Sequence, residues 1–135
     1  MAKKDTNIHT SGKRKSAIAR ATLRKGKGEI KINNKSIDLV QPKIYQMRIR
    51  EPLILAGKVA EEVSISVDVQ GGGNAGQADA TRLAIAKALA EHDNTLKKVF
   101  LDYDRQLLVA DVRQKETRKP NTQGKARSKR QKSYR

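Results

Sequence analysis

The sequence contains no cysteine and no tryptophan, and only three tyrosines and one phenylalanine among its 135 residues. Without cysteine, neither disulfide bonds nor thiolate metal sites can form, and a reducing compartment is compatible with the chain. Proteins that stack single-stranded bases need exposed aromatic side chains on a sheet face, which four scattered aromatics do not suggest. Any binding of nucleic acid should therefore depend on phosphates and shape more than on base stacking.

Long apolar runs are also missing from the chain. No stretch is long enough to span a bilayer, and no signal peptide precedes the first motif. Neither end has the basic amphipathic pattern with bulky apolar residues that is typical of helices lying on membranes. We therefore expect no membrane partner and a cytoplasmic protein.

Groups that could perform catalysis are scarce. His9 and His92 are far apart, and neither has an evident set of partners for a metal site or for general base chemistry. The acidic pairs, Glu61 with Glu62 and Asp102 with Asp104, lack a nucleophilic companion. We expect no catalytic residue, no metal, no cofactor and no enzymatic activity.

Positive charge dominates the composition, and it is concentrated at the two ends. The formal net charge is +16 at pH 7. Residues 1–28 carry nine Lys/Arg and one acid, residues 29–112 carry eleven and twelve, and residues 113–135 carry ten and one. A near-neutral middle with two basic flanks indicates a polyanionic partner, and nucleic acid is the favoured one.

The C-terminal stretch, residues 113–135, contains no Val, Ile, Leu, Phe or Met. Such a segment cannot bury enough apolar surface to offset the entropy of ordering, so we expect it to be disordered without RNA. Fully extended it could reach roughly 75 Å. The expected organisation is thus an arm at 1–11, a globular domain at 12–112 and a basic tail at 113–135, although basic tails can also serve only solubility or nuclear import.

Alternation and turn residues predict most of the strands. Residues 17–24 alternate small apolar with polar or basic side chains, so Arg20 and Arg24 should share an outer face. Residues 25–28 (KGKG) predict a hairpin turn to a second strand at 29–33, followed by a turn at 33–35. Residues 63–70 alternate most clearly, and residues 107–112 are an apolar run expected to form a last strand buried on both faces.

Four helices are expected. Two short ones, at 42–50 and 52–58, each begin at a proline, and Ile44, Met47 and Ile49 should point inward from the first. A long alanine-rich helix at 75–91 should approach the sheet closely along a buried stripe made by Ala78, Ile85, Ala88 and Leu89. A short helix capped by Asn94 or Thr95 has apolar residues at helical spacing, namely Leu96, Val99, Phe100 and Tyr103.

A dense basic cluster surrounds the first strand. Within fifteen residues it holds Lys13, Arg14, Lys15, Arg20, Arg24, Lys25 and Lys27. So many like charges repel one another unless phosphates neutralise them, so we interpret the cluster as an RNA-binding surface, with an ordinary solvated surface as the alternative.

The segment GGGNAG, from Gly71 to Gly76, fits the dinucleotide pattern G-x-G-x-x-G between a strand and a helix. The chain has too few strands for a nucleotide-binding fold, and no strand ending in an acid follows at the usual distance. Gln77 stands where a phosphate-binding loop would need lysine. We therefore interpret Gly71, Gly72, Gly73 and Gly76 as a structural turn that lets helix and strand pack closely.

Four blocks of the sequence resemble the family of small-subunit ribosomal protein nine. They are GKRKSAIARATLRKGKGEIKIN, VDVQGGGNAGQADATRLAIAKALAEHD, and LVADVRQKETRKP with the terminal KARSKRQKSYR. The resemblance covers nearly the whole chain from Gly12, and the ending SKRQKSYR resembles the archaeal and eukaryotic branch.

The resemblance implies an α+β fold and a set of partners. The family has a small mixed sheet with helices on one face and a left-handed βαβ crossover, like the second domain of ribosomal protein five, plus a long extended basic tail. Its members lie in the head of the small subunit, bind ribosomal RNA (rRNA) there beside neighbouring head proteins, and reach the transfer RNA (tRNA) in the peptidyl site with the tail tip. No homo-oligomer is expected.

Transferred to this sequence, the resemblance and the charge pattern assign two sets of residues. The rRNA-binding set is Lys13, Arg14, Lys15, Arg20, Arg24, Lys25, Lys27, Arg113, Lys115, Arg118, Lys119, Lys125 and Arg127. The tRNA-binding set is Lys129, Arg130, Lys132, Tyr134 and Arg135. Two alternatives stay open from the sequence: a free nucleic-acid-binding protein such as a chromatin factor or RNA chaperone, and a nucleotide-dependent enzyme resting on GGGNAG alone.

Overall fold

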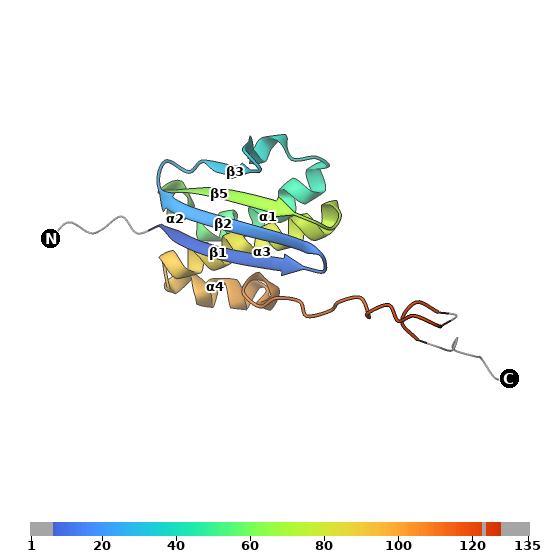
Figure 1. The fold of residues 1–135 in the computed structure, drawn as a ribbon. Coiled ribbons are helices and arrows are strands. Elements are labelled where there is room, and N and C mark those ends of the chain that lie inside the picture. The colour runs from blue at the N-terminus through green and yellow to red at the C-terminus, as the bar shows by residue number, and fades with distance from the viewer. Residues whose placement is uncertain (1–6, 123, 128–135) are drawn as a thin grey trace.

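The computed structural model describes residues 7–122 and 124–127 as a sheet layered on helices, with a C-terminal segment that leaves both (Figure 1). The strands are β1 (Ile8–Arg14), β2 (Ala17–Lys25), β3 (Ile30–Ile32), β4 (Lys35–Ser36) and β5 (Val63–Gln70). The α-helices are α1 (Lys43–Ala56), α2 (Lys58–Glu61), α3 (Asn74–His92) and α4 (Thr95–Tyr103), and two short 3-10 helices are η1 (Ile37–Leu39) and η2 (Arg105–Leu107).

The five strands form one mixed sheet in the order β1-β2-β5-β3-β4. The pairs β1/β2, β2/β5 and β3/β4 are antiparallel, whereas β3 and β5 are parallel. The connection from β3 to β5 contains α1 and α2. The mixed sheet of an α+β fold is therefore present, with β5 at its centre.

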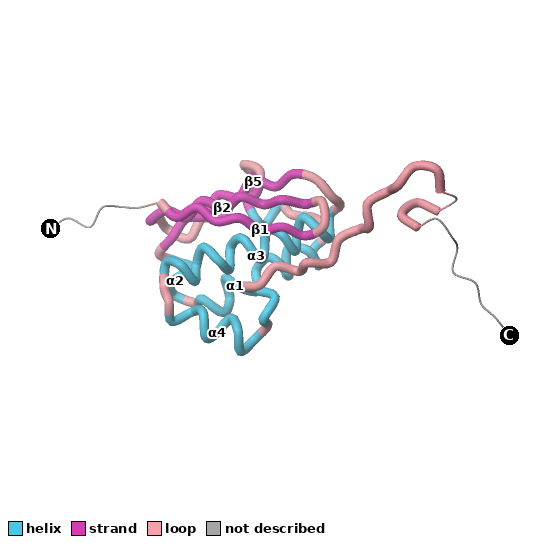
Figure 2. Tube along the Cα trace, turned by 60° about the horizontal axis from the view of Figure 1, so that its bottom comes forward, coloured by secondary structure: helices cyan, strands magenta, loops and turns pink. Residues whose placement is uncertain are grey.

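All the labelled helices cover one face of the sheet, and the other face is bare (Figure 2). The buried residues of β2 are Ala17, Ala19, Ala21 and Leu23, while Ile18, Arg20 and Arg24 are exposed. The small inner side chains let α3, which is itself rich in buried alanine, pack directly on the sheet. The predicted strand at 63–70 and the predicted faces of β2 and α3 are confirmed.

The turn at 25–28 does not make the predicted hairpin. Backbone N–H groups of Gly26 and Gly28 donate to the carbonyls of Glu62 (3.1 Å) and Val63 (3.0 Å), so the turn is fixed to the start of β5. The next strand, β3, pairs with β5 and not with β2. A glycine turn redirects the chain locally but does not determine which strands pair, so the prediction was wrong.

A hairpin instead joins β1 to β2. Its turn includes Lys15, which has a positive φ of 54°. Because β1 begins at Ile8, residues 8–11 belong to the sheet and not to the expected arm. The strand was not predicted because its apolar alternation is weak: Gly12 is buried, but Ile8 and Thr10 are only half-buried.

The two helices expected at 42–50 and 52–58 are largely one helix. Pro52 lies inside α1, where its ring is buried, and the helix ends at Gly57, whose φ is 61°. Proline interrupts one intrahelical hydrogen bond, and burial of its ring offsets part of that cost. Ile49 is buried as predicted, but Ile44 and Met47 are exposed, so that part of the inward face was wrong.

The last predicted strand, at 107–112, is absent. Leu107 is fully buried but ends the 3-10 helix η2, and Val112 is 88% exposed. In α4, Leu96 and Phe100 are buried, whereas Val99 and Tyr103 are exposed. Leu107 is therefore the last residue of the hydrophobic core, and the described part of the chain after it forms no strand.

Candidate nucleic-acid interface

The bare face of the sheet carries part of the basic cluster predicted around the first strand. Lys13, Arg20 and Arg24 are exposed there, and Lys31 of β3 joins them. A strand rises about 3.3 Å per residue, so Arg20 and Arg24 lie roughly 13 Å apart on one strand. Asp68 of β5, which is the register partner of Arg20, is an exposed acid on this face.

Lys31 was not among the predicted RNA-binding residues, although the alternating pattern around it indicates an outward side chain. Ile30 is buried and Ile32 half-buried, so alternation places Lys31 outward. Its register partner is Ser66 of β5, whose neighbour on the other side is Thr22. It thus extends the cationic surface from β1 and β2 across β5 to β3.

The two ends of β2 add further cations. Lys25 and Lys27 are exposed in the turn held against β5, and Lys15 is exposed in the turn between β1 and β2. We call the exposed set the cationic sheet face, and it comprises Lys13, Lys15, Arg20, Arg24, Lys25, Lys27 and Lys31. No Phe, Tyr or Trp lies on the described strands, so the face offers mainly charge and hydrogen bonds.

Arg14 belongs to a different environment from its predicted neighbours. Its side chain is 18% exposed, and its Nη1 atom lies 3.2 Å from Oδ2 of Asp111. The orientation does not make this contact a hydrogen bond, so Nη1 is a buried atom in an ion pair only. Arg14 therefore fixes the root of the tail from the helix side of the sheet, at the edge of the interface.

Asp111 joins Arg14 to the first residue of the tail. The backbone N–H of Arg113 donates to Oδ1 at 3.0 Å, and its guanidinium donates to Oδ2 at 2.8 Å. These Arg113 contacts, assisted by the charge of Arg14, hold the pKa of Asp111 far below its usual range. The sequence analysis did not single out Asp111, because its partners are distant along the chain or within the tail.

The described part of the tail folds back on itself. Arg127 donates to Glu116, with 2.9 Å between Nη2 and Oε1, and this pair lowers the pKa of Glu116. The backbone N–H of Lys119 donates to the carbonyl of Lys125 at 2.9 Å. The predicted cations Lys115, Arg118, Lys119 and Lys125 are all exposed. The predicted tRNA-binding residues, Lys129, Arg130, Lys132, Tyr134 and Arg135, lie outside the described residues.

The backbone of the glycine motif packs closely against the β1–β2 turn. Gly71 and Gly72 have positive φ values of 79° and 67°. A Cβ atom on Gly71 would lie 2.5 Å from the carbonyl oxygen of Ser16, and one on Gly72 would lie 3.1 Å from Ala17. Gly73 meets nothing within 4 Å and Gly76 makes only ordinary contacts, so the close approach depends on the first two glycines.

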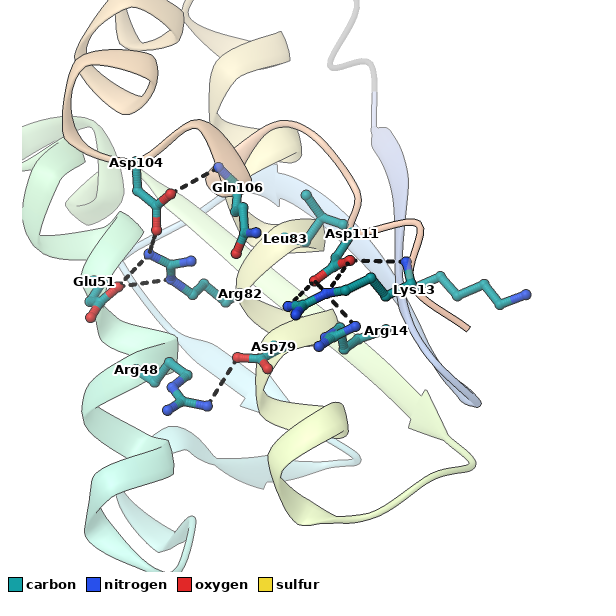
Figure 3. A pocket seen from close by; sticks show the side chains of 11 residues that line it. Lys13, Arg14, Arg48, Glu51, Asp79, Arg82, Leu83, Asp104, Gln106 and Asp111 are labelled. Carbon is teal, nitrogen blue, oxygen red and sulfur yellow. Dashed lines mark hydrogen bonds and ion pairs between the residues drawn. The ribbon is translucent and has the colours of Figure 1, made fainter. Parts of the chain in front are cut away.

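A charged cavity lies between α1, α3 and the tail root (Figure 3). It has a volume of about 360 Å³. Arg82 binds Glu51 at 2.6 Å and Asp104 at 3.1 Å, and Arg48 binds Asp79 at 3.1 Å. Because acids and bases pair within it, this cavity is suited to holding the helices together and not to attracting an anion.

Within residues 7–122 and 124–127, no three His, Cys, Asp or Glu side chains are grouped to hold a metal ion. In the same part of the chain, no helix has the length and apolarity needed to cross a membrane. His9 and His92 are both exposed, and His9 contacts only the hydroxyl of Thr22, at 3.3 Å.

Comparison with known proteins identifies the family. The family model described as ribosomal protein S9/S16 matches residues 12–135. The small ribosomal subunit protein uS9 of Methanococcus maripaludis strain C5 is 50% identical over 131 residues, which are 95% of this chain and 98% of that protein. The protein of the same name from Methanococcus vannielii is 49% identical over the same shares of both chains. The chain therefore belongs to the ribosomal protein S9/S16 family.

Proposed function

We propose that this protein is a structural constituent of the small ribosomal subunit of the cytoplasmic ribosome and binds rRNA there. The observation that carries the proposal is the cationic sheet face. All the labelled helices cover one side of the sheet, so the other side is free to meet a polyanion. Membership of the family supports rRNA and neighbouring ribosomal proteins as the partners.

The chemistry of the face favours backbone recognition. Arginine and lysine donate charge-assisted hydrogen bonds to phosphate oxygens, and the described strands carry no Phe, Tyr or Trp for stacking. Phosphate contacts position a protein on RNA without reading its sequence, so the fixed shape of rRNA would supply specificity. No catalytic role is proposed.

The tail supports a second, finer proposal. The resemblance assigns its tip, residues 128–135, to the tRNA in the peptidyl site, where Lys129, Arg130, Lys132 and Arg135 would hold the phosphate backbone, and it assigns Tyr134 to the same set. The root of the tail is tied to β1 through Asp111 and Arg14. A fixed root is what a basic tail needs if its tip is to reach one place repeatedly. The left-handed crossover, the likeness to ribosomal protein five and the location in the head stay predictions of the resemblance.

Co-sedimentation tests the main proposal against the runner-up, a free nucleic-acid-binding protein. A constituent of the subunit should remain at one copy per small subunit after a high-salt wash, because it is held by the shape of folded rRNA and by neighbouring proteins as well as by charge, whereas a binder held by phosphate charge alone loses affinity steeply as salt rises. Quantitative mass spectrometry of washed subunits measures the ratio. A ratio that falls toward zero in the wash would favour the free binder.

Deletion of residues 128–135 tests the role of the tip. The other RNA contacts remain, so subunits should still assemble, while affinity for tRNA in the peptidyl site should fall by about tenfold or more, since one charge-assisted hydrogen bond is worth about 1.5–3 kcal/mol. Filter binding of several tRNAs to purified subunits measures the effect. Equal binding with and without the tip would refute the tRNA contact, and loss for one tRNA alone would refute recognition of the backbone.

A further inference from the structure

A second cleft lies where the tail leaves the domain, and it differs in charge from the cavity of Figure 3. Its volume is about 660 Å³. Residues of the β1–β2 turn and of the tail root line it, namely Arg14, Lys15, Ser16, Arg113, Gln114 and Lys115. Four of these six residues are cations and none is an acid, so the lining attracts an anion.

Asp111 holds the two arginines of this cleft without lining it. It accepts from the backbone N–H, Nε and Nη2 of Arg113 and lies 3.2 Å from Nη1 of Arg14. A carboxylate between two guanidinium groups offsets their repulsion and fixes their orientation. The side chain of Arg113 is still 74% exposed, and a guanidinium has five N–H donors, so it keeps donors for another acceptor.

We propose that this cleft is a binding site for a backbone phosphate of RNA and that Asp111 is the positioning residue that assembles it. The proposal rests on the rRNA binding proposed above and gives it a place and a geometry. Phosphate oxygens suit arginine because its planar fork donates parallel hydrogen bonds, and Lys15 and Lys115 supply additional charge. A phosphate bound there joins β1–β2 to the tail root, so RNA binding and the direction of the tail are coupled.

An acid in a basic protein is usually expected to weaken RNA binding through its negative charge, whereas Asp111 is expected to strengthen it. If only net charge mattered, removing the Asp111 carboxylate would strengthen RNA binding. If Asp111 assembles the cleft, its removal should weaken binding, because Arg14 and Arg113 repel one another and the tail root separates from β1.

The test is a salt series of filter-binding measurements on the full-length protein, using a transcript of Methanococcus maripaludis small-subunit rRNA. Asp111→Asn should lower affinity by about tenfold and flatten the dependence of log K on log salt by about 0.7–0.9, the share of one phosphate. The matched control, Asp102→Asn, removes the same charge from an exposed site on α4 and should bind as the unchanged protein does or slightly more tightly. Equal or tighter binding by Asp111→Asn would overturn the proposal.

A second pair of variants does not depend on the stability of Asp111→Asn. Lys15 and Lys115 are exposed, so replacing both with Gln leaves the core intact and should flatten the salt dependence by roughly 0.7–1.8. The matched change of Lys97 and Lys98 on α4 should have little effect. If both pairs of variants lose the same amount of affinity, the cleft is not a phosphate site, although rRNA binding still stands. If the unchanged protein does not bind the transcript, both the rRNA binding and the cleft are refuted.

Discussion

Gly12 of β1 lies directly against α3, and replacing it with Ala should destabilise the fold strongly. A Cβ atom at this position would lie 2.3 Å from the carbonyl oxygen of Ala80 and 2.9 Å from the backbone nitrogen of Ala84. Both obstacles are helix backbone, so no side chain can rotate away. Either β1 or α3 must therefore move by about 1 Å to restore an ordinary contact distance.

The size of the effect follows from that movement. Overpacking a core typically costs about 1–3 kcal/mol, and backbone obstacles place Gly12→Ala near the upper end, at about 3 kcal/mol. For a domain of this size, each kcal/mol shifts the melting temperature by roughly 4–8 °C. The expected fall in Tm is therefore about 12–24 °C.

The same substitution at Gly76 is the matched control. Gly76 is in the first turn of α3, and its added Cβ would meet only ordinary contacts at 3.5 Å and 3.6 Å. Alanine forms helices better than glycine, so Gly76→Ala should be neutral or stabilise by about 0.5–1 kcal/mol. Urea unfolding followed by circular dichroism measures both variants. Equal stability of Gly12→Ala and the unchanged protein would refute the close packing of β1 on α3.

Three further predictions concern the turn, the ion pairs and acid. Gly72→Val should cost about 1–3 kcal/mol in unfolding free energy because of positive φ, whereas Gly73→Val should be nearly neutral; equal costs would contradict this assignment. Arg82→Met should lose about 1–2 kcal/mol because two partly exposed carboxylates lose their partner, and a double-mutant cycle with Asp104→Asn should show coupling in urea unfolding. The backbone N–H of Gln106, with help from Arg82, lowers the pKa of Asp104 in the fold, so its stabilisation is present above the unfolded carboxyl pKa and is lost as pH falls below about 4. The urea midpoint should therefore be lower at about pH 3 than at about pH 6, and a constant midpoint would count against this linkage.

Local periodicity was sufficient to predict several elements. The alternation of β5 and the inner alanines of β2 identified both strands and their buried faces, because a half-buried strand must alternate. The alanine stripe of α3 likewise predicted a helix close to the sheet. These signals lie within single segments, so they do not depend on the rest of the fold.

Pairing between distant segments could not be predicted in the same way. The insertion of β5 between β2 and β3 depends on which strand best fills the centre of the sheet, a property of the whole fold. The contact between Arg14 and Asp111 joins the two ends of the domain, so no local pattern indicates it. Charge identified which residues are basic, but only the structure separates the exposed Arg20 from the half-buried Arg14.

Lysine footprinting on the protein bound to small-subunit rRNA alone tests the central claim most directly. Acetylation followed by mass spectrometry compares each lysine in the free and bound protein. The account predicts protection of Lys13 and Lys31 on the cationic sheet face, with Lys97 and Lys98 of α4 remaining reactive. Protection of the α4 lysines while the lysines of the sheet face stay reactive would contradict it.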